Sequence, residues 1–294
     1  MILHAYKNGN ADVEIHSDGT RIIECEGELD LEYPLNTDVR LSRKCAFGYN
    51  KNTDSAVCRF CHESATTDGT TASRENIFDF FRMMHGLPKG TEIAVGVNQN
   101  DDAVELFLFM CFLRDYVANV TVNQGMVHSM LKIIKEWKAN KLIHGLGISY
   151  RKGMKDIPVE LLNMDDTVVH VIAGIDSIED IKELASKGVN KLLVLGEKDF
   201  GFNLGKVKIV SDSHREWYRK VHELFSLFKV VSFDNLAVEQ LNIKRFVKNW
   251  EETYQHEFSF YANIVDGTFS PSSRSADTVP FKPVSEYFAE MTKP

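Results

Sequence analysis

Short apolar runs that alternate with helical segments constrain this fold more than any other feature of the chain. Apolar residues recur at helical spacing in Ser73–His85, Asp102–Tyr116, Val127–Lys138, Ser177–Lys187 and Arg215–Phe228. The runs between these helices are too short to be helices themselves, and they read as strands: Glu92–Val97, Ala118–Val122, Leu142–Ile148, Val168–Ala173, Leu192–Leu195 and Val230–Phe233. Short apolar strands separated by helices indicate a parallel sheet buried on both faces. The sequence therefore predicts an α/β fold.

The number of strand–helix units in series favours a partial or full (β/α) TIM-like barrel over the alternative, an open doubly wound sheet. Asp38–Leu41 supplies the first barrel strand, so we place the barrel at residues 36–240. Before it, the strands Asp12–His16 and Thr20–Cys25 flank a Gly-bearing turn and form an N-terminal β-hairpin extension within residues 1–35. After it, residues 241–294 form a C-terminal cap.

The C-terminal cap contains two features of different composition. Phe258–Val265 reads as a strand that closes the sheet, and Gly267–Thr278 is rich in Ser, Thr, Gly and Pro. We predict that this second segment is a loop that covers the barrel.

Composition limits the class of protein. The chain has 294 residues and a formal net charge of −8. This charge argues against a broad surface for binding nucleic acid, but it is compatible with a local basic groove. No apolar run reaches the roughly 18–20 residues of a membrane span. Met1–Asn10 lacks the apolar core of a signal peptide. We therefore expect a cytoplasmic protein without a membrane partner, whose thiols stay reduced.

Three clustered cysteines carry the strongest functional signal. Cys45, Cys58 and Cys61 stand as C-x12-C-x2-C, with Phe60 directly before the third. Clustered thiols in a chain with no sign of export indicate metal binding. Three thiolates are one short of the four that close a structural zinc or ferredoxin-type site. This set therefore predicts a metal centre with one coordination position open to chemistry. Cys25 and Cys111 read instead as small apolar side chains.

A structural zinc site is the alternative to a metal centre with an open coordination position. His62 is available as the fourth ligand, although its position next to Cys61 makes tetrahedral closure by both residues awkward. In that case the protein is a zinc-stabilised binding module without catalysis.

The cysteine segment resembles the radical S-adenosylmethionine (radical SAM) superfamily, whose motif is C-x3-C-x-aromatic-C after the first barrel strand. Phe60 and Cys61 match the second half of this motif, whereas the first spacing is x12, with Ala46–Ala56 inserted. Longer first spacings occur in some 7-carboxy-7-deazaguanine synthases. Cys61-His62-Glu63-Ser64 is also similar to the Cys-His-Glu start found in bacterial and phage members of unassigned function. The resemblance covers about residues 36–240, and only the cysteine motif is specific.

The resemblance implies a [4Fe–4S] cluster on Cys45, Cys58 and Cys61, with S-adenosylmethionine bound at the open iron. One electron, from a donor such as flavodoxin or ferredoxin, cleaves this cofactor to a 5′-deoxyadenosyl radical. The radical abstracts hydrogen from a substrate that the sequence does not identify. The cofactor-binding positions implied by this resemblance are Phe60, Gly96, Asn98, Asn123, Ser149 and His170.

Two further alternatives follow from departures within the resemblance. Gly96-Val97-Asn98 stands where relatives carry Gly-Gly-Glu, so the backbone contact to the methionyl amino group is retained and the carboxylate is absent. A barrel that binds S-adenosylmethionine without reacting is one outcome of that change. The long cysteine spacing raises the other, an enzyme that modifies a nucleoside or 7-deazapurine.

Other polar positions carry weaker signals. Asp234-Asn235, after the last strand, can touch substrate, but such an Asp is more often a helix N-cap. Gly145-Leu146-Gly147 indicates tight packing, because the rest of a phosphate-loop fingerprint is missing. Tyr261 and Arg274 are candidates for the barrel mouth, and His128, His144 and His222 have no metal spacing. No other cysteine cluster is present, so we expect no auxiliary iron–sulfur cluster, and the sequence identifies no catalytic residue.

Overall fold

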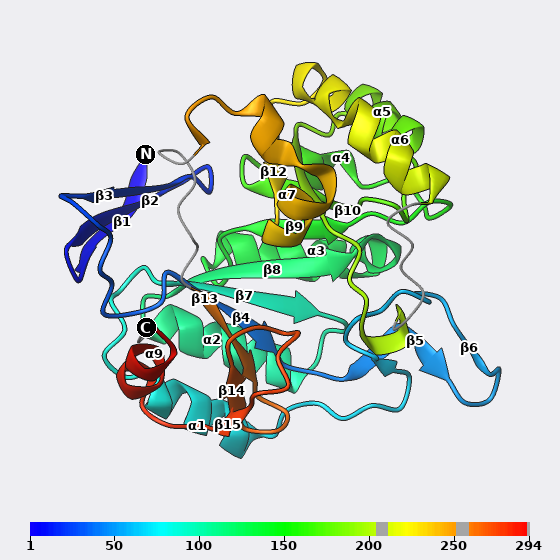
Figure 1. Cartoon of the computed structure of the whole chain (residues 1–294). Helices are drawn as coiled ribbons and strands as arrows, with labels where there is room; N and C mark the ends of the chain where they lie inside the picture. The colour runs from blue at the N-terminus through cyan, green and yellow to red at the C-terminus, as the bar shows by residue number, and fades with distance from the viewer. Residues whose placement is uncertain (204–210, 251–258, 293–294) are drawn as a thin grey trace.

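A large, mostly parallel sheet forms the body of the molecule (Figure 1). The computed structural model describes residues 1–203, 211–250 and 259–292. Ten strands pair in the order β12-β11-β10-β9-β8-β7-β4-β13-β14-β15. Their bounds are β4 Asn36–Arg40, β7 Glu92–Val97, β8 Val117–Asn123, β9 Leu146–Ser149, β10 Thr167–Ile172, β11 Lys191–Leu195, β12 Val230–Phe233, β13 Ser259–Asn263, β14 Thr268–Ser270 and β15 Val279–Pro280. The pairs from β12 to β13 are parallel, and the last two pairs are antiparallel.

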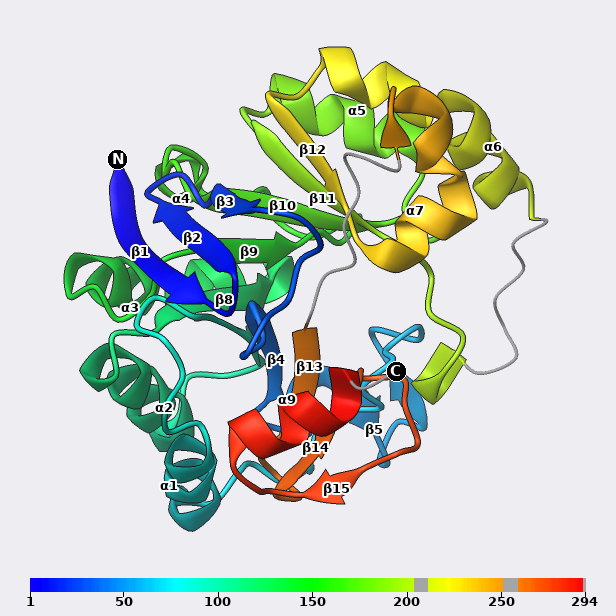
Figure 2. The same cartoon turned by 60° about the vertical axis from the view of Figure 1, so that its left-hand side comes forward.

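The helices follow the strands as the alternation predicts, and they lie on the outside of the sheet (Figure 2). They are α1 Arg74–Met83, α2 Asp102–Leu113, α3 Val127–Ala139, α4 Val159–Leu162, α5 Ile178–Ser186, α6 Asp212–Lys220, α7 Asn235–Leu241 and α9 Val284–Thr292. Short 3-10 turns lie at Gln124–Met126, Gly201–Asn203, Val221–Ser226 and Ile243–Phe246. Several helices begin where a side chain accepts a backbone N–H of the first turn: Ser73, Asp101, Ser177, Ser211 and Asp234.

The two faces of the parallel strands differ. On β10, Val169 and Val171 are buried in the layer beneath the helices, whereas His170 and Ile172 are half-buried on the opposite face and line a cavity. Alternate side chains of a strand point to opposite faces. The expectation of strands buried on both faces is therefore wrong for the central strands, because their inner face borders open space.

The predicted barrel is not closed. Within the described ranges the sheet ends at β12 on one side and at β15 on the other, and β13 pairs with β4 rather than with β12. The strand expected at Phe258–Val265 thus extends the sheet beside its first strand, although Phe258 lies outside the described residues. The described residues form an α/β sheet that does not close into a full barrel, and the partial barrel remains compatible with this sheet.

The N-terminal hairpin is confirmed and extended. β2 (Ala11–His16) and β3 (Arg21–Cys25) pair antiparallel, and β1 (Ile2–Asn8) adds a strand that the sequence did not single out. The C-terminal segment Gly267–Thr278 is only partly a loop, because its first residues form β14. No helix among the described residues is long and apolar enough to cross a membrane.

Candidate functional site

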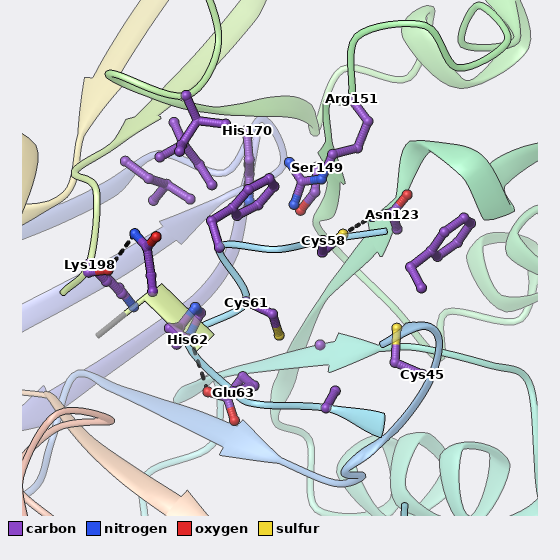
Figure 3. Close-up of a pocket in the computed structure, with 18 of the residues that line it drawn as sticks. Cys45, Cys58, Cys61, His62, Glu63, Asn123, Ser149, Arg151, His170 and Lys198 are labelled. Atoms are coloured by element: carbon purple, nitrogen blue, oxygen red, sulfur yellow. Dashed lines mark hydrogen bonds and ion pairs between the residues drawn. The ribbon is translucent and has the colours of Figure 1, made fainter. Parts of the chain in front are cut away.

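A cavity of about 230 Å³ opens at the carboxyl ends of the parallel strands (Figure 3). In parallel α/β folds this end of the sheet is where ligands bind. The predicted site residues line this one cavity: Cys45, Cys58, Phe60, Cys61, Gly96, Asn98, Asn123, Ser149 and His170. The structure therefore brings together positions that span more than a hundred residues of sequence.

A short hairpin accounts for the long spacing between the first two cysteines. β5 (Lys44–Asn50) carries Cys45 and pairs antiparallel with β6 (Ser55–Ala56), so the chain turns back on itself. The backbone N–H of Cys58 then donates to the carbonyl of Phe47 at 3.2 Å. The N–H of Cys61 donates in turn to the carbonyl of Cys58 at 3.1 Å. The insertion thus leaves all three thiols on one wall.

The thiols lie in a setting that combines burial with hydrogen-bond donors. Burial raises the pKa of Cys45, and hydrogen bonds from the backbone N–H groups of Phe47 and Gly48 act against this rise. Burial likewise raises the pKa of Cys61, with N–H groups of Ala65 and Glu63 opposing it. The nearby sulfurs raise both pKa values further, since adjacent thiolates repel. A cation among these sulfurs would remove that repulsion.

Three neighbouring strands present Asn123, Ser149 and His170 in a single row. The register pairs Asn123 of β8 with Ser149 of β9, and Ser149 with His170 of β10. Asn123 Nδ2 lies 3.8 Å from Cys58 Sγ, so this row reaches the cysteine wall. Burial, followed by the charge of Arg151, lowers the pKa of His170 to about 4. His170 is therefore neutral near pH 7.

Arg151 is a cavity residue that sequence reasoning missed. It follows β9, and its guanidinium lies 4.6 Å from the centre of the Phe60 ring, a cation–π contact. Its Nε is buried and has no hydrogen-bond partner, whereas its Nη1 donates to the backbone carbonyl of Tyr150, and no carboxylate among the described residues forms an ion pair with it. The signal in the sequence was its place two residues after Ser149, at the end of a strand.

Glu63, directly after the cysteine loop, is fully engaged. It forms an ion pair with Arg40, accepts a hydrogen bond from Tyr261 at 3.0 Å, and lies 3.1 Å from His62 Nε2. Burial on its own would raise the pKa of Glu63, but these three partners lower it to about 2. Glu63 thus ties the cysteine loop to β4 and β13.

A further part of the cavity lining comes from the segment that follows β11. Glu197 is buried there, 2.7 Å from His214 Nε2, and it accepts a hydrogen bond from Asn203. This segment contacts the cysteine loop directly, since the N–H of Phe202 donates to the carbonyl of Cys61 at 3.0 Å. Gly201 makes that approach possible, because a Cβ there would lie 2.3 Å from the carbonyl oxygen of His62.

The weaker sequence candidates lie elsewhere. Asp234 is the N-cap of α7, which is the structural role that the sequence favoured, and it also accepts a hydrogen bond from the N–H of Gly196. The Tyr261 hydroxyl donates a hydrogen bond to Glu63. The described residues 267–278, which include Arg274, do not line the cavity. Cys25, Cys111, His128, His144 and His222 are also outside it. Gly145 and Gly147 are sites of tight packing, as predicted.

Donor chemistry separates a cluster from a single ion. In the three described ranges, no group of three or more His, Cys, Asp and Glu side chains is arranged to hold a metal ion. His62, the fourth ligand of the zinc alternative, directs Nε2 to Glu63. Cys45, Cys58 and Cys61 all line this cavity, and backbone N–H groups lie close to the sulfurs of Cys45 and Cys61.

Comparisons with known proteins support the fold. No family model and no curated protein matches the chain. Among solved structures, the crystal structure of Streptococcus suis SuiB is similar, with a TM-score of 0.53 and 14% sequence identity. The match covers 82% of this chain and 60% of SuiB, so the chain spans less than two thirds of that protein. At this identity the likeness shows a shared α/β fold alone.

Proposed function

We propose that this protein is a radical SAM enzyme that binds a [4Fe–4S] cluster through Cys45, Cys58 and Cys61. One observation carries the proposal: the three cysteines, despite the long spacing between the first two, all line one cavity at the carboxyl ends of the parallel strands. When bound, such a cluster supplies the electron that cleaves S-adenosylmethionine to a 5′-deoxyadenosyl radical, which abstracts hydrogen from the substrate.

The residues around the thiols have defined tasks in this proposal. Backbone N–H groups of Phe47 and Gly48 hydrogen-bond Cys45 Sγ, and those of Glu63 and Ala65 hydrogen-bond Cys61 Sγ. These bonds favour the thiolate form that metal binding requires, and they tune the potential of a bound cluster. Asn123 Nδ2 is the side-chain donor at Cys58.

Other cavity residues fit the binding of S-adenosylmethionine. Arg151 has no carboxylate partner among the described residues and a buried Nε without a hydrogen-bond partner, so its guanidinium can bind the carboxylate of S-adenosylmethionine. Gly96 borders open space, since a Cβ there would have no atom within 4 Å, and its backbone is accessible to the amino group. His170 is neutral and therefore compatible with the sulfonium charge.

Anaerobic purification and reconstitution with iron and sulfide test the proposal. We expect a brown protein with about four irons per chain. After reduction with dithionite, it should convert S-adenosylmethionine to 5′-deoxyadenosine. A colourless protein that retains one zinc would overturn the proposal in favour of the binding module. A brown protein that binds S-adenosylmethionine without cleaving it would support the non-reactive alternative raised by Asn98.

A further inference from the structure

Two cations on the cavity wall, Arg151 and Lys198, have no carboxylate partner in the described part of the chain. The two carboxylates that share the wall are already neutralised. Glu63 is engaged by Arg40, and Glu197 by His214. Unpaired, partly buried cations are costly, so they mark places where an anionic ligand gains affinity. Proteins therefore tend to keep them for binding.

Lys198 is held at the far side of the cavity from the first cysteine. Figure 3 shows Lys198 and Cys45 on opposite sides of the cavity. The side chain of Lys198 is half-buried, and its Nζ lies 5.8 Å from the centre of the Phe200 ring. That ring packs edge-on against His62 at 5.4 Å. Asn203 fixes the backbone by donating to the Lys198 carbonyl at 3.0 Å.

Asp234 is a carboxylate that the charge of Lys198 affects. The backbone N–H groups of Gly196 and Ala237 both donate to Asp234 Oδ1, which holds this side chain at the start of α7. Asp234 and Lys198 both lie in the described part of the chain, and no ion pair joins them.

Apolar side chains line the same cavity as this cation. Ile172 and Leu195 come from β10 and β11, and Ile175 is 36% exposed. With Arg151 assigned to S-adenosylmethionine, apolar lining residues and the one cation that remains in the described lining complement a ligand that has an apolar body and one anionic group. This combination offers little to a cationic or fully polar ligand.

We propose that Lys198 binds the anionic group of the substrate, and that the substrate is an organic carboxylate or phosphate monoester with an apolar portion. The inference rests on the proposed function, because S-adenosylmethionine occupies Arg151 and leaves Lys198 for a second anion. Lys198 is then a specificity-determining residue, distinct from the cysteine wall.

The test uses reconstituted protein with saturating S-adenosylmethionine and three probes: sodium butyrate, monobutyl phosphate and uncharged butanol. Dissociation constants come from ligand-detected NMR. We expect at least one of the two anions to bind more tightly than butanol. Lys198→Gln should weaken that anion about tenfold or more, the size of one charge-assisted hydrogen bond. Lys198→Arg should retain binding. The control is Lys132→Gln, which removes an exposed lysine on α3 and should change nothing.

Three results would overturn the assignment: anions that bind no better than butanol, no binding at all, or equal anion affinity in wild type and Lys198→Gln. Failure of the proposed function gives a different pattern, namely no binding of S-adenosylmethionine to wild type. In that event the same titration in Arg151→Met, without S-adenosylmethionine, reads Lys198 alone. The preference between butyrate and monobutyl phosphate assigns the anion as carboxylate or phosphate.

Discussion

The two ends of the parallel strands each border a cavity, and the charged side chains that line the two cavities differ in how they are paired. At the carboxyl ends, Arg151 and Lys198 have no carboxylate partner among the described residues. At the amino ends, a cavity of about 340 Å³ has largely buried carboxylates that are paired. Glu92 binds Arg21 at 2.7 Å, and Asp166 forms an ion pair with Lys138. The two lysines of this cavity have no carboxylate partner in the described ranges, but Lys191 donates to the carbonyl of Asp18 and Lys229 is exposed to solvent. The two ends of the sheet therefore differ in their partly buried cations: those at the amino ends are bonded, whereas Arg151 and Lys198 at the carboxyl ends have no carboxylate partner in the described part of the chain.

The boundary between the cavities is a single layer of side chains. A Cβ on Gly147 would lie 2.6 Å from His170 Cε1 and 2.7 Å from Thr121 Oγ1. His170 therefore fills the space that Gly147 leaves, on the inner face between the two ends. Paired charges therefore mark a structural end of the sheet, and partly buried cations without a carboxylate partner mark a binding end.

The largest effect should come from the cysteine wall. We expect Cys58→Ser to abolish the visible charge-transfer absorbance of the reconstituted protein and all formation of 5′-deoxyadenosine, because it removes one of three ligands. Absorption spectra and product analysis measure both. Cys25→Ser, the same substitution on the half-exposed strand β3, should leave both intact. Equal losses in the two variants would remove the functional difference between the cavities.

Much of the fold was predictable because local pattern and tertiary structure agree. β7 and β12 have the bounds that their apolar runs predict, and Ser73 caps α1 as expected. Closure was not predictable, since whether β13 pairs with β4 or β12 depends on contacts far apart in sequence. The prediction that the strands are buried on both faces was wrong for β10 for a related reason: hydrophobic periodicity does not reveal which face of a strand borders a cavity.

The candidate site divides in the same way. Cys45, Cys58 and Cys61 have a spacing that points to their chemistry, and strand ends indicated Asn123, Ser149 and His170. The hairpin that reconciles the x12 spacing was invisible, because β6 has only two residues. Arg151 and Lys198 were missed because an arginine or lysine in a loop is ordinarily solvated. What distinguishes Arg151 and Lys198 is that they line a cavity without a carboxylate partner among the described residues, and this is visible only in the folded chain.

The carboxyl ends also contain a paired charge, Glu63, and its contribution to the free energy of unfolding should depend on pH. Its pKa falls from 4.5 to about 2, which corresponds to about 3 kcal/mol of folding stability. Because the folded-state pKa is lowered, this stability is present above pH 4.5 and is lost as the pH falls toward 2. We expect Glu63→Gln to cost about 3 kcal/mol near pH 7 in urea unfolding, and almost nothing near pH 2. A gap that is constant with pH would contradict this. Asp68→Asn, in an exposed pair with Lys51, is the control and should cost little.

At the amino ends, removal of a cation should cost stability and leave ligand binding unchanged. Arg21→Met leaves the Glu92 carboxylate, whose side chain is 13% exposed, with the Asn119 amide as its remaining hydrogen-bond partner in the described part of the chain. We expect a loss of about 2–3 kcal/mol in the free energy of unfolding, since an unpaired buried carboxylate is costly. The dissociation constant for S-adenosylmethionine should equal that of wild type. A weakened S-adenosylmethionine complex in a stable variant would reverse the roles of the two ends.

The matched variant at the carboxyl ends should behave in the opposite way. Arg151→Met removes a guanidinium without stranding any carboxylate, so we expect a stability loss below about 1 kcal/mol, the size of its contact with Phe60. Binding of S-adenosylmethionine should weaken about tenfold or more, because its carboxylate loses a charged donor. Equilibrium dialysis and urea unfolding separate the two readouts. A variant that is strongly destabilised but binds normally would make Arg151 a structural residue.

The smallest effect concerns the layer between the cavities. Gly147→Ala places a methyl group against the ring of His170, which must turn away, and we expect a loss of about 1 kcal/mol. Gly96→Ala adds the same group where no atom lies within 4 Å, and it should cost less. If His170 is the obstacle, His170→Ala should suppress the cost of Gly147→Ala in a double-mutant cycle. Additive costs would mean that Thr121, rather than His170, separates the two ends. The boundary would then be a contact between β8 and β9, with His170 free to move within the upper cavity.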